Sequence, residues 1–242
     1  MIPTDLSNLV LWLKADALAL NDGDAVGTWT DSSGNGKDAT QATSAKKPVF
    51  KTAIRNGLPV IRFDGVDDWL QTPNITWGTT VSIFVVCTTT STANGDVVNI
   101  YSNAIGSVYE MRVDGSSQIA FRPSDTGGGT CEATKGITTL TGSWFYCAGV
   151  RAAGSSTAYV NGSAGSTNSG CATQRSGDSP VSIGEFSLGF QFFGGDVAEI
   201  VIYNAALGTS DRQGIEDYLY NKWFVAPVET PSKPRVNTLV RM

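Results

Sequence analysis

The chain has 242 residues and a mass of 25.5 kDa, with 27 glycines and only 16% charged residues. Its net charge of −5 and isoelectric point near 4.7 provide no basic field for a nucleic-acid backbone or an anionic membrane, so we expect neither as a partner. The absence of histidine excludes Ser-His-Asp and Cys-His catalysis and His-ligated metals, so any metal would need oxygen ligands.

Apolar and β-branched runs of strand length recur along the chain. The predicted strands are Leu9–Leu13, Leu58–Phe63, Val81–Cys87, Val97–Tyr101, Val108–Val113, Gln118–Phe121, Trp144–Val150, Thr157–Val160, Val181–Ile183 and Ala198–Tyr203. Turn signals separate them, namely Asn35-Gly36, Asn56-Gly57, Asp64-Gly65, Asp114-Gly115 and Asn161-Gly162. This pattern predicts an antiparallel sandwich or barrel.

One amphipathic helix is predicted near the C-terminus. Ser210 is the expected N-cap, and Gln213 follows three residues later as in a capping box. The apolar stripe expected to face the core consists of Ile215, Tyr218, Leu219 and Trp223.

The composition changes after Phe224, so we predict one domain over 1–224 and an extended arm over 225–242. Three basic residues against Glu229 give the arm a charge of +2, which leaves −7 on the domain. An arm with no core of its own is either a flexible tail or is ordered by docking, and we favour docking on a neighbouring subunit. The residues expected to anchor it are Pro227, Pro231, Lys233, Pro234, Arg235, Leu239 and Arg241.

Two pairs of cysteines differ in their surroundings. Cys87 and Cys147 lie in strand-like runs, where a free thiol packs as a small apolar group. Cys131 and Cys171 lie in loop-like segments and are candidates for a disulfide, which the sequence leaves open. The first residues carry no basic start, and the apolar run Leu9–Leu13 is too short for a signal-peptide core, so we expect no ordinary export signal.

Several segments occur in an order that resembles a known family. They are Leu9-Val-Leu-Trp-Leu-Lys-Ala-Asp16, Trp29-Thr-Asp-Ser-Ser-Gly-Asn-Gly-Lys-Asp-Ala39, Val60-Ile-Arg-Phe-Asp-Gly-Val-Asp-Asp-Trp-Leu70, Trp144-Phe-Tyr146, Ala158-Tyr-Val-Asn-Gly162 and Gly195-Asp-Val-Ala-Glu-Ile-Val-Ile-Tyr-Asn-Ala-Ala-Leu207. Together they resemble the laminin-G-like jelly-roll domains of the concanavalin A-like lectin/glucanase superfamily, which are common in bacterial surface proteins and phage proteins. The resemblance spans residues 8–224 and implies an all-β, antiparallel two-sheet jelly roll with one short C-terminal helix. It does not fix the function, because one sandwich hosts enzymes, lectins and structural modules.

The glutamates argue against an enzyme. Glucanases of this superfamily carry a Glu-x-Asp-x-x-Glu strand, because glycoside hydrolysis needs two suitably spaced carboxyl groups. That motif is absent and the six glutamates are scattered. Glu110 and Glu185 could meet across the sheet, but exposed strand carboxylates are the commoner explanation.

Aromatic side chains favour carbohydrate binding. Sugar rings stack on aromatic faces carried by loops on a rigid scaffold. The candidate ligand-binding residues are Phe186, Phe190, Trp77 and Tyr101, each of which could equally pack in the core, and we expect Phe192 or Phe193 to be buried.

Three carboxylates fall within five residues, at Asp64, Asp67 and Asp68. Like charges this close repel each other unless they are solvated or share a cation, so calcium is the candidate metal, with Asp31 or Asn35 as further ligands. The alternative, a solvated acidic turn, is favoured because no EF-hand-like spacing is present. No other cofactor is expected.

These observations lead to one hypothesis and three alternatives. The hypothesis is a non-catalytic attachment module on a larger assembly, a phage virion, which binds host glycans and contacts neighbouring subunits through its arm. The first alternative is a structural capsid-cementing protein without sugar binding. The second is a fragment of an exported bacterial carbohydrate-binding protein, located outside the cell or at its surface, and a weak glycosidase comes last.

Overall fold

The computed structural model describes residues 1–90, 95–102, 106–114, 118–126, 129–136, 141–170, 174–186 and 189–226. Cys171 and nearly all of the predicted arm lie outside these ranges. The same holds for every residue expected to anchor the arm, namely Pro227, Pro231, Lys233, Pro234, Arg235, Leu239 and Arg241.

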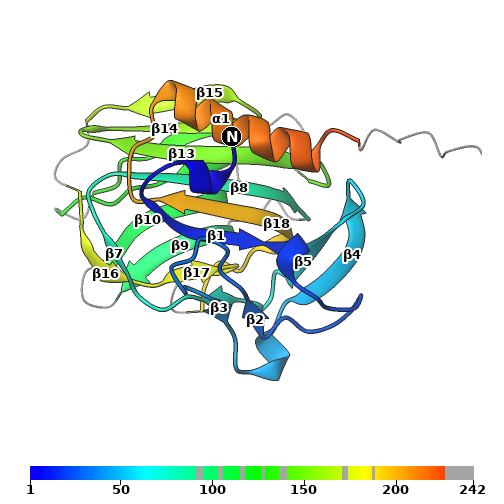
Figure 1. Ribbon diagram of the computed structural model, residues 1–242. Helices are drawn as coiled ribbons and strands as arrows, with labels where there is room; N and C mark the ends of the chain where they lie inside the picture. The colour runs from blue at the N-terminus through cyan, green and yellow to red at the C-terminus, as the bar shows by residue number, and fades with distance from the viewer. Residues whose placement is uncertain are drawn as a thin grey trace, which may run out of the picture.

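The predicted two-sheet antiparallel sandwich is confirmed, and each of its sheets has eight strands (Figure 1). The first sheet runs in the order β15 (Ser163–Asn168), β14 (Ser155–Val160), β13 (Phe145–Ala152), β8 (Val81–Thr89), β18 (Gly194–Tyr203), β5 (Leu58–Asp64) and β4 (Val49–Arg55), with β1 (Leu9–Lys14) also paired to β18. Along one edge, the first half of β18 pairs with β5 and its second half pairs with β1.

The second sheet runs in the order β12 (Ala133–Gly136), β11 (Gln118–Phe121), β10 (Gly106–Asp114), β9 (Gly95–Ser102), β17 (Val181–Ile183), β6 (Leu70–Gln71), β3 (Ala39–Thr40) and β2 (Thr28–Trp29). A separate pair joins β7 (Ile75–Trp77) to β16 (Gly177–Ser179). Short 3₁₀ turns are η1 (Pro3–Asp5), η2 (Ala15–Ala17) and η3 (Ser44–Lys46). Each of the predicted strands is present, several of them extended by a few residues.

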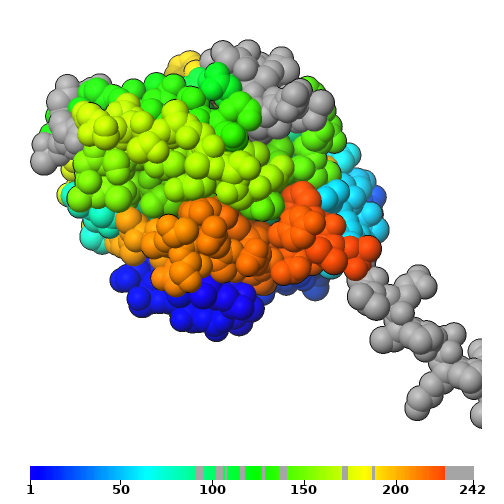
Figure 2. All heavy atoms as spheres, turned by 90° about the horizontal axis from the view of Figure 1, so that it is seen from above, coloured from blue at the N-terminus to red at the C-terminus, as the bar shows by residue number. Residues whose placement is uncertain are grey.

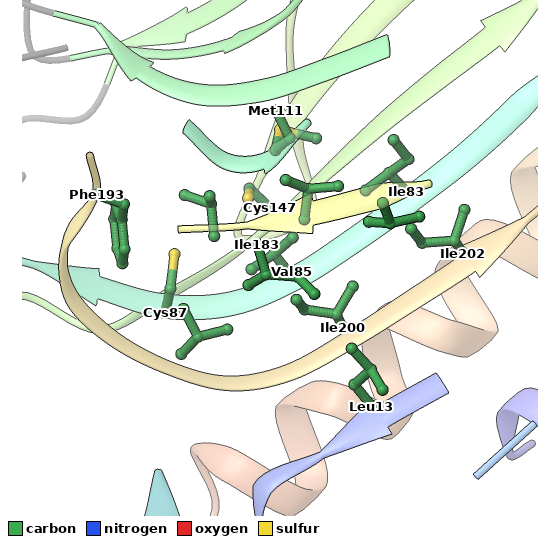
Figure 3. Packing of buried hydrophobic residues seen from close by; sticks show 14 of the residues in the cluster. Leu13, Ile83, Val85, Cys87, Met111, Cys147, Ile183, Phe193, Ile200 and Ile202 are labelled. Carbon is green, nitrogen blue, oxygen red and sulfur yellow. The ribbon is translucent and has the colours of Figure 1, made fainter. Parts of the chain in front are cut away.

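The core lies between the two sheets, where side chains that alternate along each strand face each other. Figure 3 shows Val85 of β8 and Ile200 of β18 packed against Ile183 of β17 and Met111 of β10. These side chains are fully buried, so the sandwich fixes the positions of the strands that carry polar residues on the opposite face of the second sheet.

The helix α1 (Thr209–Trp223) covers the other face of the first sheet. Figure 2 shows it between the N-terminal segment and the strands β14 and β15. Ile215, Leu219 and Trp223 are buried there as predicted. The expected cap is wrong, because the N-cap is Gly208, which makes no side-chain hydrogen bond, and Ser210 lies inside the helix.

Two of the predicted turns are tight hairpins. Asn56-Gly57 joins β4 to β5, and Asn161-Gly162 joins β14 to β15. All four residues have positive φ, between 48° and 76°. This is the conformation of a type I′ turn, whose twist matches that of the flanking strands, and it explains the Asn-Gly sequence.

The cysteines divide as the sequence suggested. Cys87 and Cys147 are buried free thiols on the adjacent strands β8 and β13. Burial, followed by the hydrogen bond and charge of Cys147, raises the pKa of the Cys87 thiol well above its ordinary value. Cys131 is disulfide-bonded, while Cys171, the other half of the suggested pair, is outside the described residues.

Candidate functional site: a pocket on the second sheet

The face of the second sheet that points away from the core carries a row of polar residues. Thr40, Gln71, Ser182, Asn99 and Glu110 stand in register on five neighbouring strands. Their sequence neighbours on the same strands, such as Ile183 and Met111, belong to the core, so alternation turns the polar side chains outward. Ser182, Asn99 and Glu110 in this row are buried beneath other segments, so the polar groups of this face are held at fixed positions.

A loop covers one end of this row. We call it the phenylalanine loop, and its described residues are 185–186 and 189–191. Phe186 and Phe190 form an antiparallel bridge, in which the Phe186 N–H donates to the Phe190 carbonyl at 3.0 Å. The loop is tied to β9 because the Asp96 N–H donates to the Gln191 carbonyl at 3.1 Å. Phe193 just beyond it is buried, as expected.

A pocket of about 680 Å³ lies between this loop and the ends of β10 and β11. Its described lining residues are Glu110, Arg112, Arg122, Ser124, Thr130, Arg175, Phe186, Phe190 and Gln191. The lining thus combines two phenyl rings with three guanidinium groups, a carboxylate and neutral polar groups. Such a mixture of apolar surface and a few fixed polar groups is typical of small-molecule sites.

Three of the four predicted aromatic residues come together here. Phe186 and Phe190 both line the pocket, and Phe190 as a residue is 62% exposed. Tyr101 on β9 contacts Phe186, with ring centroids 6.1 Å apart and planes inclined by 52°. An exposed phenyl ring on a loop with anchored ends is available for stacking.

The fourth aromatic residue, Trp77, is corrected by the structure. It is 2% exposed, its indole N–H donates to the Ser179 carbonyl at 2.9 Å, and its ring packs edge-on against Tyr109. The ring is a core group between β7 and its neighbours, and it is not part of the site.

Charged side chains beneath the loop form a partly paired cluster. Arg122 Nη1 lies 3.0 Å from Glu110 Oε2, and Arg122 Nε lies 2.7 Å from Glu132 Oε2. Asp96 is fully buried beside them. Burial above all, and then the charge of Glu110, raises the pKa of Asp96 well above its ordinary value, while the charges of Arg112 and Arg122 lower it.

Three arginines of the pocket were not among the residues predicted from the sequence, namely Arg112, Arg122 and Arg175. One signal was available for Arg112, because Glu110 and Arg112 alternate with the apolar residues Tyr109, Met111 and Val113 along one predicted strand. That alternation places both charges on the face opposite the core. The contribution of Arg175 depends on a loop, which no periodicity reveals.

A second pocket, of about 640 Å³, lies at the other end of the same face. The half-buried Trp69 lines it together with Asp38, Thr40, Gln41 and Gln71. Phe63, on the other side of the acidic turn, is buried in the core, whereas Trp69 is not part of it. Trp69 therefore serves as the aromatic reference residue for the second pocket, as Phe186 and Phe190 do for the first.

The acidic turn after β5 brings three predicted metal ligands together. One carboxylate oxygen from each of Asp64, Asp67 and Asp68 lies within 4.8 Å of the others. Asp64 Oδ1 accepts hydrogen bonds from the backbone N–H groups of Val66, Asp67 and Asp68, so this carboxylate also shapes the turn. Burial raises the pKa of Asp68 to about 6. Calcium binding here stays a prediction, which a shift in melting temperature on adding calcium would test.

Of the other two predicted ligands, Asp31 does not join this group, and the side chains of Asp31 and Asn35 are engaged elsewhere. The Asp31 carboxylate accepts from the backbone N–H groups of Trp12, Ser33 and Lys37. The Asn35 amide donates to the Leu9 carbonyl at 2.9 Å. Both side chains hold the loop between β2 and β3 against β1, a structural role that corrects their assignment as metal ligands.

No helix in the described ranges is long and apolar enough to cross a membrane. No curated protein matches the chain. Solved structures do resemble it, at sequence identities low enough that the likeness concerns the fold alone.

The binding domain of Paraclostridial mosquitocidal protein 1 aligns over 88% of this chain and 53% of its own length, with 15% identity and a TM-score of 0.66. The binding domain of botulinum neurotoxin serotype D, solved in complex with N-acetylneuraminic acid, aligns over 87% of this chain and 51% of its own, with 13% identity and a TM-score of 0.63. A sialidase from Trypanosoma rangeli aligns over 90% of this chain and 34% of its own, with 16% identity and a TM-score of 0.61. The chain thus spans about half the length of the two toxin binding domains.

Residues 64–211 match the Laminin_G_3 family model, described as the concanavalin A-like lectin/glucanases superfamily. The match covers more than half of the chain and agrees with the two-sheet sandwich and the single helix. The chain therefore belongs to the concanavalin A-like lectin/glucanases superfamily.

Proposed function

We propose that this protein is a non-catalytic carbohydrate-binding module and that its glycan binds in the pocket beneath the phenylalanine loop. The observation that carries the proposal is the composition of that pocket. The exposed ring of Phe190 stands beside Arg112, Gln191 and other fixed polar groups in one cavity.

The aromatic part of the lining matches the apolar face of a sugar ring, and the polar part matches its hydroxyl groups. The C–H groups of a sugar ring pack against an aromatic face, while its hydroxyls need donors and acceptors at set positions. Phe186 and Phe190 supply the first, and the polar groups at the ends of β10 and β11 supply the second. Because the scaffold beneath is a close-packed sandwich, these groups are held in place before the ligand arrives.

The carboxyl groups favour binding over hydrolysis. Glycoside hydrolysis requires two carboxyl groups on opposite sides of the scissile bond. Glu110 is the one carboxylate among the described lining residues, and it is paired with Arg122. Asp96 is fully buried, and Glu185 is not among the described lining residues. The toxin binding domains, one of them solved with a sialic acid, are further support for a role in binding.

The test is binding of a panel of neutral and acidic oligosaccharides, measured by saturation-transfer NMR and then by calorimetry. Phe190→Ala should reduce binding of each positive sugar by about fivefold, since a stacked aromatic ring contributes on the order of 1 kcal/mol. Tyr220→Ala is the matched control, because Tyr220 is also an exposed aromatic residue but lies on α1, across the first sheet. If no sugar binds, or if Phe190→Ala binds like the wild type, the proposal is overturned.

We also propose that the module attaches a larger assembly, a phage virion, to host glycans and is held in that assembly by the arm 225–242. The arm's +2 charge against −7 on the domain supports this role. A chain ending at Phe224 should fail to join its particle, as measured by light scattering, but should bind glycans unchanged. If that truncation abolishes assembly and substitution of Phe186 and Phe190 has no effect on host attachment, the protein is a structural cement.

A further inference from the structure

Arg112 is an unusual lining residue, because it is buried and its charge is not paired. Its side chain lies on β10 at the floor of the pocket and is 9% exposed. Its Nε is buried without a hydrogen-bond partner. Among the residues that the structure describes, no ion pair or hydrogen bond to its guanidinium is present, whereas Arg122 in the same pocket contacts both Glu110 and Glu132.

Neither of the nearby acids forms an ion pair with this guanidinium, although the charges of Arg112 and Asp96 interact. Asp96 stands directly across from Arg112 on β9, but its carboxyl is fully buried, with Oδ1 also lacking a hydrogen-bond partner. Burial raises the pKa of Asp96 well above its ordinary value, although the charge of Arg112 acts to lower it. Glu110 is engaged with Arg122 at 3.0 Å. A buried cation without a counter-ion is costly, and proteins retain such a group where a ligand completes it.

The net charge of the pocket lining also favours an anionic ligand. Three arginines against one glutamate give it a net charge of +2, in a chain whose net charge is −5. A positive pocket in an acidic protein concentrates anions locally. One unpaired guanidinium matches one singly charged group, and its planar fork of donors fits a carboxylate with two parallel hydrogen bonds.

We propose that the glycan recognised by this pocket carries a carboxylate, and that the Arg112 guanidinium binds it. This inference rests on the proposed function and specifies the ligand class at the same site. The sugar ring would lie against Phe190 while its acid group reaches down to Arg112, so one ligand uses both the apolar rim and the charged floor.

Two sources supply such a group, a sialic acid and a uronic acid. The probes are 3′-sialyllactose and a galacturonic acid oligomer, each compared with a neutral counterpart, lactose and a galactose oligomer, by calorimetry at pH 7. At least one acidic probe should bind about tenfold or more tightly than its neutral counterpart, since hydrogen bonds to charged groups are the stronger kind. The pair that shows this preference identifies the source.

Arg112→Met should abolish the preference for the acidic probe. The same substitution should leave the melting temperature unchanged or raise it, because it removes an uncompensated buried charge. Arg62→Met is the control for net charge, since it removes one positive charge from β5, where Arg62 pairs with Asp196 in the first sheet. That variant should keep the preference.

The outcomes separate the two proposals. If neutral and acidic probes bind equally and Phe190→Ala weakens both, the carbohydrate-binding function stands and the carboxylate inference is overturned. If Arg112→Met retains the acid preference, the inference is overturned as well. If no probe binds at all, both proposals fail.

Discussion

The indole N–H of Trp12 donates a 2.6 Å hydrogen bond to the carboxylate of Glu199, although 187 positions separate the two residues. Glu199 lies on β18 with no exposed surface. It also accepts from Tyr218 at 2.9 Å, and from Lys222 and Trp223 at 2.8 Å each. A single buried acid thus ties β1 and α1 to the central strand of the first sheet.

We expect Glu199→Gln to lower the free energy of unfolding by about 3–5 kcal/mol, the usual cost of breaking a buried ion pair. The amide NH₂ would face donors where the carboxylate oxygen accepted from them, and the Lys222 ammonium would lose its buried counter-charge. Urea denaturation measures the change. Asp16→Asn is the control, because it breaks the more exposed ion pair of the same lysine and should cost less than about 1 kcal/mol. Equal costs for the two variants would contradict this account.

Glu185, at the base of the phenylalanine loop, makes stability depend on pH. Burial raises its pKa to about 7, against contributions from Lys46 and from the Gly189 N–H that lower it. Because the folded state holds this proton more tightly than the unfolded chain, the stability that the group contributes is present below about pH 4.5 and is lost as the pH rises through 7.

Glu185→Gln should therefore be more stable than the wild type at pH 8, by up to about 3 kcal/mol, and close to it at pH 4.5. Melting temperatures of both proteins across this range measure the difference. Asp68 also has a raised pKa, but it is present in both proteins and cancels in the comparison. A difference that stays constant with pH would show that Glu185 does not titrate in this window.

The states of the cysteines predict how many thiols react with a reagent before and after reduction. With Cys131 disulfide-bonded and Cys87 and Cys147 free and buried, the native protein should react slowly with a thiol reagent. Unfolded in guanidinium without a reductant, it should release two thiols per chain, and four after reduction. Finding four thiols before reduction would mean that the disulfide is absent.

The sequence predicted the long apolar strands and missed short or polar ones, although several of the missed strands, such as β2, β4 and β7, also contribute residues to the core. Strands such as Val81–Thr89 and Gly194–Tyr203 are buried along their whole length, and their apolar runs are unmistakable. By contrast, β15 (Ser163–Asn168) has no large apolar residue and no buried position, so pairing with β14 alone makes it a strand. Tertiary context supplies what local propensity lacks there.

Residue type alone predicted only some of the residues that line the candidate binding site. The aromatic candidates near glycines include Phe186 and Phe190, which line the pocket, but also Trp77, which is buried in the core. Asp31 was predicted only as a further ligand to the cluster of Asp64, Asp67 and Asp68, and its carboxylate instead holds a loop, while Asp64 lies in the cluster. Only three-dimensional packing decides which side chains share a cavity, and this is also why Arg112 emerged from the structure.

The most direct test of the account is to map the bound glycan on the protein by NMR, with the sugar that binds best as the probe. The account predicts that the largest shifts fall on the backbone amides of Phe186, Phe190 and Gln191 and on the side-chain Nε–H of Arg112. Shifts that cluster instead around Trp69 in the second pocket, or on α1, would contradict the assignment of the binding site to the pocket beneath the phenylalanine loop.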